Sequence, residues 1–221
     1  MTVIFGVTYD NGAMVGADQQ RHHGITLASG GKAKKTVVMT TKAVVAKAGI
    51  GPDADYIFDE ARKLIGDRDL DAADVADIFE QLAPAVLERA RKVHGHLPTT
   101  PLHFIVSGIT KGEPSIHALQ TEIQERTDAT GAGQVMALGV RKETNSRAGE
   151  LVYTAAWKDS GVISLDLNKW AADLMEEEHA AKSYSVDYPM DFALVRLGQA
   201  VEERHYPNRP TEAFSVQFIP K

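Results

Sequence analysis

Residues 2–18 read TVIFGVTYDNGAMVGAD, and this stretch decides the fold. The run from Thr2 to Tyr9 is almost continuously apolar, which predicts a β-strand buried on both faces. Asp10-Asn11-Gly12 is typical of a tight hairpin turn, because asparagine and glycine tolerate the positive φ angles that such a turn requires. Residues 13–18 are then expected to form the partner strand, which ends at Asp18.

Outward from this hairpin, the pattern predicts alternating groups of strands and helices. Strands are expected at residues 36–40, 43–48, 102–106, 115–119, 135–140, 151–157 and 214–219. A first helix is expected at 53–65 with Asp53 as its cap, and a second is expected to start near Asp71. Two more helices are expected at 167–178 and 189–204, and a polar loop is expected at 141–149. This order predicts an α+β chain with one domain over residues 1–221. Its expected architecture is a four-layer αββα sandwich, two stacked antiparallel sheets flanked by helix pairs.

The composition limits the function classes. The 221 residues are 43% hydrophobic, enough for a substantial core, and the net charge of −6 gives no basic surface for nucleic acid or an anionic membrane. The absence of cysteine excludes a thiol nucleophile and thiolate metal sites, and it makes the cytoplasm the default location. His22 and His23 are adjacent and would point to opposite faces of a strand, so no metal and no cofactor are expected.

Thr2 directly follows a methionine, and methionine aminopeptidases remove an initiator methionine when the next residue is small. Processing would give Thr2 a free α-amino group, whose pKa of about 7.7–8.0 lets it accept the hydroxyl proton, so that one residue supplies both nucleophile and base. A cation held by an acid would favour the neutral amine, and Asp18 and the Lys34-Lys35 pair are the obvious suppliers. Gly49 directly follows a predicted strand and offers a backbone N–H for an oxyanion. The alternative interpretation of Thr2 is an ordinary first-strand threonine.

The same positions resemble a known family, the proteasome-type β subunits, which are N-terminal-nucleophile (Ntn) hydrolases. The resemblance is closest to the bacterial HslV peptidase, and the bacterial Anbu group and the β-proteobacterial homologues are further candidate relatives. It extends over residues 2–58 and stays in register to about Gly108. It rests on Thr2, the hairpin, Gly16-Ala17-Asp18-Gln19-Gln20, Gly24, Ala33-Lys34-Lys35 and Ala48-Gly49.

The resemblance implies a role for each matching residue. Thr2 is the nucleophile, Asp18 orients the catalytic lysine, and Gly49 donates to the oxyanion. Lys35 is the expected lysine because it lies fourteen residues before Gly49, whereas Lys34 fits if residues are counted forward from Asp18.

The second half departs from the family pattern. A Gly-Ser-Gly is expected before the third helix. Gly131-Ala132-Gly133 has the right distance but no serine, so Ser160, which precedes a predicted helix, is the chosen candidate. The family also has an aspartate and a Ser-Gly between the fourth helix and the next strand, and residues 204–210 contain neither.

The family implies a self-compartmentalising threonine endopeptidase that cuts peptides or unfolded proteins inside a homo-oligomeric ring, with an unfoldase ATPase as a candidate partner. Two alternatives remain open. One is a catalytically silent ring or scaffold subunit. The other is an Ntn hydrolase or transpeptidase for small amides.

Overall fold

The computed structural model describes residues 2–22, 29–49, 51–95, 102–121, 123–139, 141–156, 161–181 and 186–219. The helices are α1 (Gly51–Ile65), α2 (Ala72–His94), α3 (Thr144–Ala156) and α4 (Leu167–Ala180). The strands of the first half are β1 (Ile4–Tyr9), β2 (Gly12–Asp18), β3 (Gln20–His22), β4 (Ser29–Lys32), β5 (Thr36–Val38), β6 (Ala43–Ala48), β7 (His103–Thr110) and β8 (Glu113–Gln120). The remaining strands are β9 (Glu125–Thr130), β10 (Val135–Leu138), β11 (Ile163–Asp166), β12 (Met190–Arg196), β13 (Glu202–Tyr206) and β14 (Ser215–Phe218).

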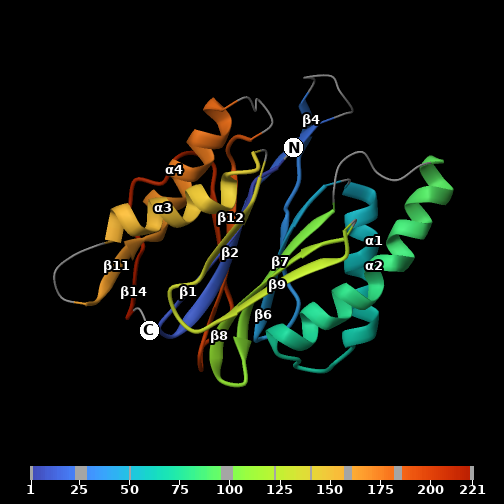
Figure 1. Cartoon of the computed structure of the whole chain (residues 1–221), viewed down its shortest axis with the longest axis horizontal. Helices are drawn as coiled ribbons and strands as arrows, with labels where there is room; N and C mark the ends of the chain where they lie inside the picture. Colours follow the sequence, from blue (N-terminus) through green and yellow to red (C-terminus); the bar gives the residue numbers. More distant parts are fainter. Residues whose placement is uncertain are drawn as a thin grey trace.

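Two five-stranded antiparallel sheets form the centre of the molecule. One has the strand order β10-β1-β2-β12-β13, and the other has the order β5-β6-β7-β8-β9. In Figure 1, α3 and α4 lie over the outer face of the first sheet, and α1 and α2 lie over the outer face of the second. The predicted α+β fold with two stacked antiparallel sheets between helix pairs is therefore confirmed.

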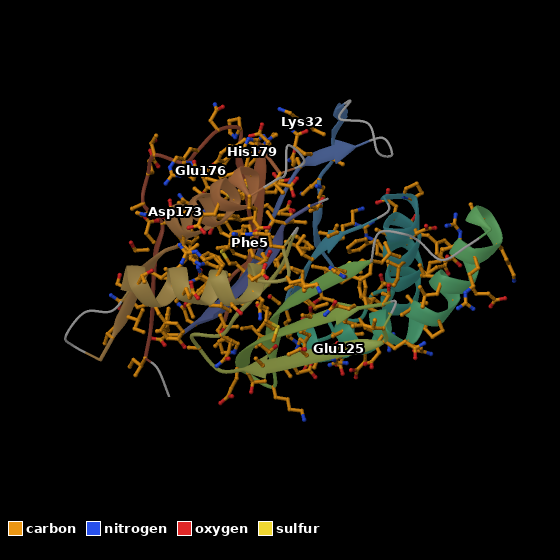
Figure 2. The ribbon with its side chains drawn as sticks, turned by 45° about the horizontal axis from the view of Figure 1, so that its top comes forward. Phe5, Lys32, Glu125, Asp173, Glu176 and His179 are labelled. Atoms are coloured by element: carbon orange, nitrogen blue, oxygen red, sulfur yellow. The ribbon has the colours of Figure 1, made fainter. Side chains whose placement is uncertain are left out.

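Three apolar clusters hold these layers together. Between the two sheets, Ile4, Val15 and Ala17 pack against residues such as Ile105 and Ile116. The outer clusters join each sheet to its helices, with Phe5 against Trp170 of α4 at a ring-centroid distance of 5.3 Å. Figure 2 shows Phe5 inside this layer, while Asp173 and Glu176 of α4 lie on its outer side. Every residue of β1 and β2 is buried, as the continuous apolar run predicted.

The third helix corrects two predictions. Residues 151–157 were expected to be a strand and 141–149 a loop, but α3 runs from Thr144 to Ala156 across both segments. Its buried residues Thr144, Ala148 and Val152 recur every four positions, the spacing of one helix face. The aromatic and β-branched residues around Tyr153 suggested a strand, yet Tyr153 is exposed on the helix surface.

The segment expected to be a helix at 189–204 is also corrected, because it forms the hairpin β12–β13. In β12 every residue but the last is buried, since the strand lies between β2 and β13 inside the sheet. A short apolar run of this kind has no period that separates a buried strand from a helix. Gly198, with φ of 71°, lies in the turn that reverses the chain.

Helix starts give one success and one error. Helix α2 starts near Asp71, as predicted, and the structure shows that Asp71 is its N-cap and accepts a hydrogen bond from the Asp74 N–H. Asp53 is not a cap, because α1 begins at Gly51 and Asp53 lies buried in its first turn, where it forms an ion pair with Arg89 of α2.

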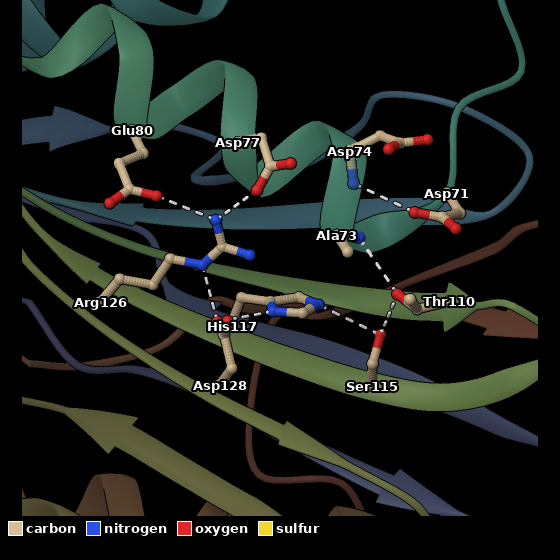
Figure 3. Close-up of polar contacts among 10 residues, drawn as sticks. All are labelled: Asp71, Ala73, Asp74, Asp77, Glu80, Thr110, Ser115, His117, Arg126 and Asp128. Atoms are coloured by element: carbon tan, nitrogen blue, oxygen red, sulfur yellow. Dashed lines mark hydrogen bonds and ion pairs between the residues drawn. The ribbon is translucent and has the colours of Figure 1, made fainter.

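A polar network fastens α2 to the outer face of its sheet (Figure 3). Arg126 of β9 donates to Asp128 at 2.7 Å and to Glu80 of α2 at 3.0 Å. His117 lies 2.8 Å from the Asp128 carboxylate through Nδ1 and 3.2 Å from Ser115 Oγ through Nε2. Ser115 is completely buried, so this serine–histidine–aspartate set joins secondary structure and does not face a substrate.

Candidate active site

The β1–β2 hairpin and the start of β5 bring Thr2, Asp18 and Lys35 together. Thr2 precedes β1, and the antiparallel register pairs Ile4 with Ala17, so the end of β2 returns to the start of β1. The Val3 N–H donates to Asp18 Oδ1 at 3.0 Å. Lys35 directly precedes β5 in the facing sheet, so its side chain meets the hairpin from the other side of the sandwich.

Lys35 is the centre of this arrangement. Its ammonium group donates to Thr2 Oγ1 at 2.6 Å, to Asp18 Oδ2 at 2.9 Å and to the Gln20 carbonyl oxygen at 2.6 Å. An ammonium group has three donors, and each of these three oxygens is an acceptor for one of them. The side chain of Lys35 is only 8% exposed and that of Asp18 is fully buried, so water screens this ion pair little.

Asp18 is held by three donors. Besides the Lys35 ammonium, the backbone N–H groups of Val3 and Gln20 both donate to its carboxylate at 3.0 Å. Burial raises the pKa of Asp18, and these three donors oppose the rise because they favour the charged form.

The neighbouring lysine points elsewhere. Lys34 forms an ion pair with Glu203 of β13, and both side chains are about half exposed (52% and 43%). Thr2 therefore has Lys35 beside it, the lysine reached by counting back from Gly49, and the structure gives Lys34 no contact with the Thr2 hydroxyl.

Gln19, the residue after Asp18, belongs to a second polar cluster that the sequence analysis did not predict. Gln19 Nε2 donates to Asp191 Oδ2 of β12, and His205 Nδ1 of β13 lies 2.8 Å from Asp191 Oδ1. The Gln19 carbonyl accepts from the Ala33 N–H at 2.9 Å, two residues before Lys35. These contacts fix both segments that carry the acid and the lysine. The Gln19–Asp191 contact joins residues 172 positions apart, and no local sequence pattern predicts it, especially while 189–204 is interpreted as a helix.

Gly49 lies at the end of β6 with φ of 117°, a conformation that favours glycine. The Lys47 N–H donates to the Lys35 carbonyl at 3.0 Å, so the chain that leads to Gly49 runs beside the segment of Lys35. This places Gly49 at the same end of the sandwich, and its role as an oxyanion donor stays a prediction.

The second-half candidates fare differently. Ser160 lies outside the described residues, and the helix that follows it, α4, is the fourth helix and not the third. Gly131-Ala132-Gly133 lies at the far end of β1, because the Gly131 carbonyl accepts from Thr8 Oγ1 at 2.7 Å. The third helix is instead preceded by β10, whose Leu138 pairs with Ile4, so the chain next to Thr2 on this side is the β10–α3 connection.

The expectation about residues 204–210 is also corrected. Residues 204–206 belong to β13. The segment between α4 and the next strand, β12, is 181–189. That segment contains Ser183, Ser185 and Asp187, and residues 182–185 of it are outside the described part. The lack of an aspartate therefore followed from the misplaced helix, whereas a Ser-Gly is absent from this segment as well.

Comparison with known proteins agrees with this geometry. Residues 2–92 match the family model described as "Proteasome subunit". The first matching structure is the Anbu (Gly-1) mutant from Hyphomicrobium sp. strain MC1, with a TM-score of 0.65 and 16% identity over 94% of this chain and 87% of that chain. The second is Anbu, an ancestral β-subunit, from Yersinia bercovieri, with a TM-score of 0.67 and 12% identity over 95% and 88% of the two chains. Among curated proteins, none matches this chain.

These matches confirm the resemblance to proteasome-type β subunits. The family match covers the segment that carries Thr2, Asp18, Lys35 and Gly49, and the structural matches extend the shared fold over nearly the whole chain. Within the described residues, no helix combines the length and the apolar character needed to cross a membrane.

Proposed function

We propose that this proteasome-like subunit is an Ntn amide hydrolase in which Thr2, after removal of Met1, is the nucleophile. The observation that supports this most directly is the position of the Lys35 ammonium group. It lies 2.6 Å from the Thr2 hydroxyl and 2.9 Å from a fully buried carboxylate.

The proposed reaction has two stages. In the first, the Thr2 α-amine takes the hydroxyl proton, Oγ1 attacks the amide carbonyl carbon, and the resulting tetrahedral intermediate loses its C–N bond. The leaving amine departs with the proton from the α-ammonium group, and an ester to Thr2 remains. In the second stage, water gives a proton to the same amine, attacks the ester carbonyl, and releases the acid while Oγ1 regains its proton.

Lys35 would assist in two ways. Its positive charge stabilises the oxygen of Thr2 as negative charge develops on it, and it disfavours a second positive charge on the nearby α-amine. Asp18 holds the lysine in this position and balances its charge. Gly49 is proposed to donate its N–H to the oxyanion of the tetrahedral intermediate.

We extend the proposal to the assembly. A single-domain subunit with an open site would cut any accessible chain, so enclosure in a homo-oligomeric ring would limit cleavage to peptides and unfolded proteins. An unfoldase ATPase is the proposed partner, and the cytoplasm is the proposed location. The Anbu and proteasome-subunit matches support an oligomeric assembly of this kind.

Hydrolysis of small peptide amides tests the proposal. Thr2→Ala should abolish turnover without unfolding the protein, and Thr2→Ser should retain part of it, since serine keeps both the hydroxyl and the amine. Thr41→Ala is the matched control, because Thr41 lies in an exposed turn where its hydroxyl donates to Asp69. Undiminished turnover in Thr2→Ala would rule out the mechanism.

Intact mass separates this proposal from a silent ring subunit. Loss of the mass of Met1 is required for a free amine on Thr2. A retained Met1 together with absent turnover would support the silent subunit.

A further inference from the structure

A cavity of about 490 Å³ opens between the two sheets, and its volume is within the range of small-molecule sites. One wall comes from the ends of β7, β8 and β9, with His103, Gln120 and Glu125. The other wall comes from the end of β10 and the start of the α3 region, with Leu138, Arg141 and Lys142.

Strand pairing places this cavity beside the candidate active site. Leu138 pairs with Ile4, two residues from Thr2, and His103 pairs with Ala48, next to Gly49. One wall therefore includes β10, the neighbour of β1, which follows Thr2. The other wall includes β7, the neighbour of β6, which leads to Gly49.

The cavity lies on the side of Thr2 opposite to Lys35. In the first sheet β1 has β10 on one side and β2, with Asp18, on the other. In the second sheet β6 has β7 on one side and β5, preceded by Lys35, on the other. A substrate whose carbonyl carbon meets Thr2 Oγ1 therefore extends toward the cavity on one side of its scissile bond.

The charges of the cavity are divided between its walls. Arg141 is already neutralised, because its Nε and Nη2 contact Oε1 of the fully buried Glu178 at 2.7 and 2.6 Å. Lys142 is exposed and forms no ion pair with any residue that the structure describes. Glu125 of β9 (Figure 2) lines the same cavity and likewise pairs with no described cation. Burial lowers the pKa of His103, which keeps it neutral at pH 7.

We propose that this cavity is a substrate subsite for a polar residue flanking the scissile bond, with Lys142 attracting acidic groups and Glu125 attracting basic ones. This inference rests on the proposed function and adds a substrate class to it. The lining is mixed, with Met136 and Leu138 beside polar side chains, so the selectivity is carried by the charges of Lys142 and Glu125 and not by exclusion of apolar residues.

Opposite charge reversals test the subsite. Two series of small amide substrates are needed, one with an anionic, neutral or cationic group on the acyl part and one with the same groups on the leaving amine. Lys142→Glu should lower the ratio of kcat/KM for anionic over cationic substrates by about fivefold, and Glu125→Lys should raise it by about as much, in at least one series. Lys63→Glu is the control, because Lys63 lies about 18 Å along α1 from the end next to Gly49.

A covalent threonine probe without charged groups separates the two proposals. Suppose that Thr2 is labelled equally in the wild type and in both variants, while the kcat/KM ratios for anionic over cationic substrates stay the same or move in the same direction. The subsite is then overturned, and the proposal that Thr2 is the nucleophile stands. No labelling of the wild type overturns both.

Discussion

Replacing Lys35 by methionine should destabilise the protein far more than the same change at Lys34. Methionine has a similar length and no charge, so Lys35→Met leaves the buried Asp18 carboxylate without its cation. Breaking a buried pair from one side costs about 3–5 kcal/mol. The Lys34–Glu203 pair is half exposed on both sides, so Lys34→Met should cost about 0–1 kcal/mol.

The penalty at Lys35 should depend on pH in a defined direction. Burial already raises the pKa of Asp18, and Lys35 is the main group opposing that rise. Without Lys35, folded Asp18 binds its proton more tightly than unfolded Asp18 does. The loss of stability is therefore smallest below about pH 4, where the carboxyl group is protonated in both states, and it grows as the pH rises through the folded-state pKa.

Urea unfolding of the two variants between pH 4 and pH 8 measures this. Adding Asp18→Asn to Lys35→Met should recover part of the stability at pH 8 and remove the added pH dependence, because no buried carboxylate remains. Equal costs for the Lys34 and Lys35 variants, or a Lys35 penalty that does not change with pH, would refute the reasoning.

Three further predictions concern the scaffold around the site. Glu178→Ala should lower the free energy of unfolding, measured in urea, by about 3 kcal/mol, because it removes the fully buried partner of Arg141. Glu177 is one-third exposed, so Glu177→Ala should lower it by about 1 kcal/mol or less. Arg126→Met should lose about 1 kcal/mol of stability at low salt and less in 1 M NaCl, since its acidic partners are at least half exposed. Gly108→Ala should lower the thermal unfolding midpoint by the equivalent of about 1–3 kcal/mol, because an added Cβ would overlap the backbone carbonyl oxygen of Lys42, directly before β6.

The first half of the fold could be predicted because its signals are local. The Asn11-Gly12 turn, the apolar runs on either side of it and the helical spacing that begins near Asp71 each act within a few residues, and each element appears where its pattern indicated. The second half could not be predicted in the same way. The buried strand β12 has no period, and α3 carries its aromatic residue on the exposed face.

The candidate site could be predicted as a set of residues but not as a geometry. Spacing alone left Lys34 and Lys35 as alternatives, and only the direction of each side chain separates them. The support behind Asp18, from Gln19 through Asp191 to His205, depends on strand pairing that no single segment encodes.

Covalent labelling of Thr2 tests the central claim most directly. An epoxyketone reacts with the hydroxyl and the free α-amine of the same residue to form a ring, so the adduct requires both groups on Thr2. We predict one adduct per chain, located by peptide mass spectrometry on an N-terminal Thr2, with labelling slowed at least about 100-fold in Lys35→Met and unchanged in Lys34→Met. A chain that retains Met1 and forms no adduct would contradict the account. So would an adduct that forms as fast in Lys35→Met as in the wild type.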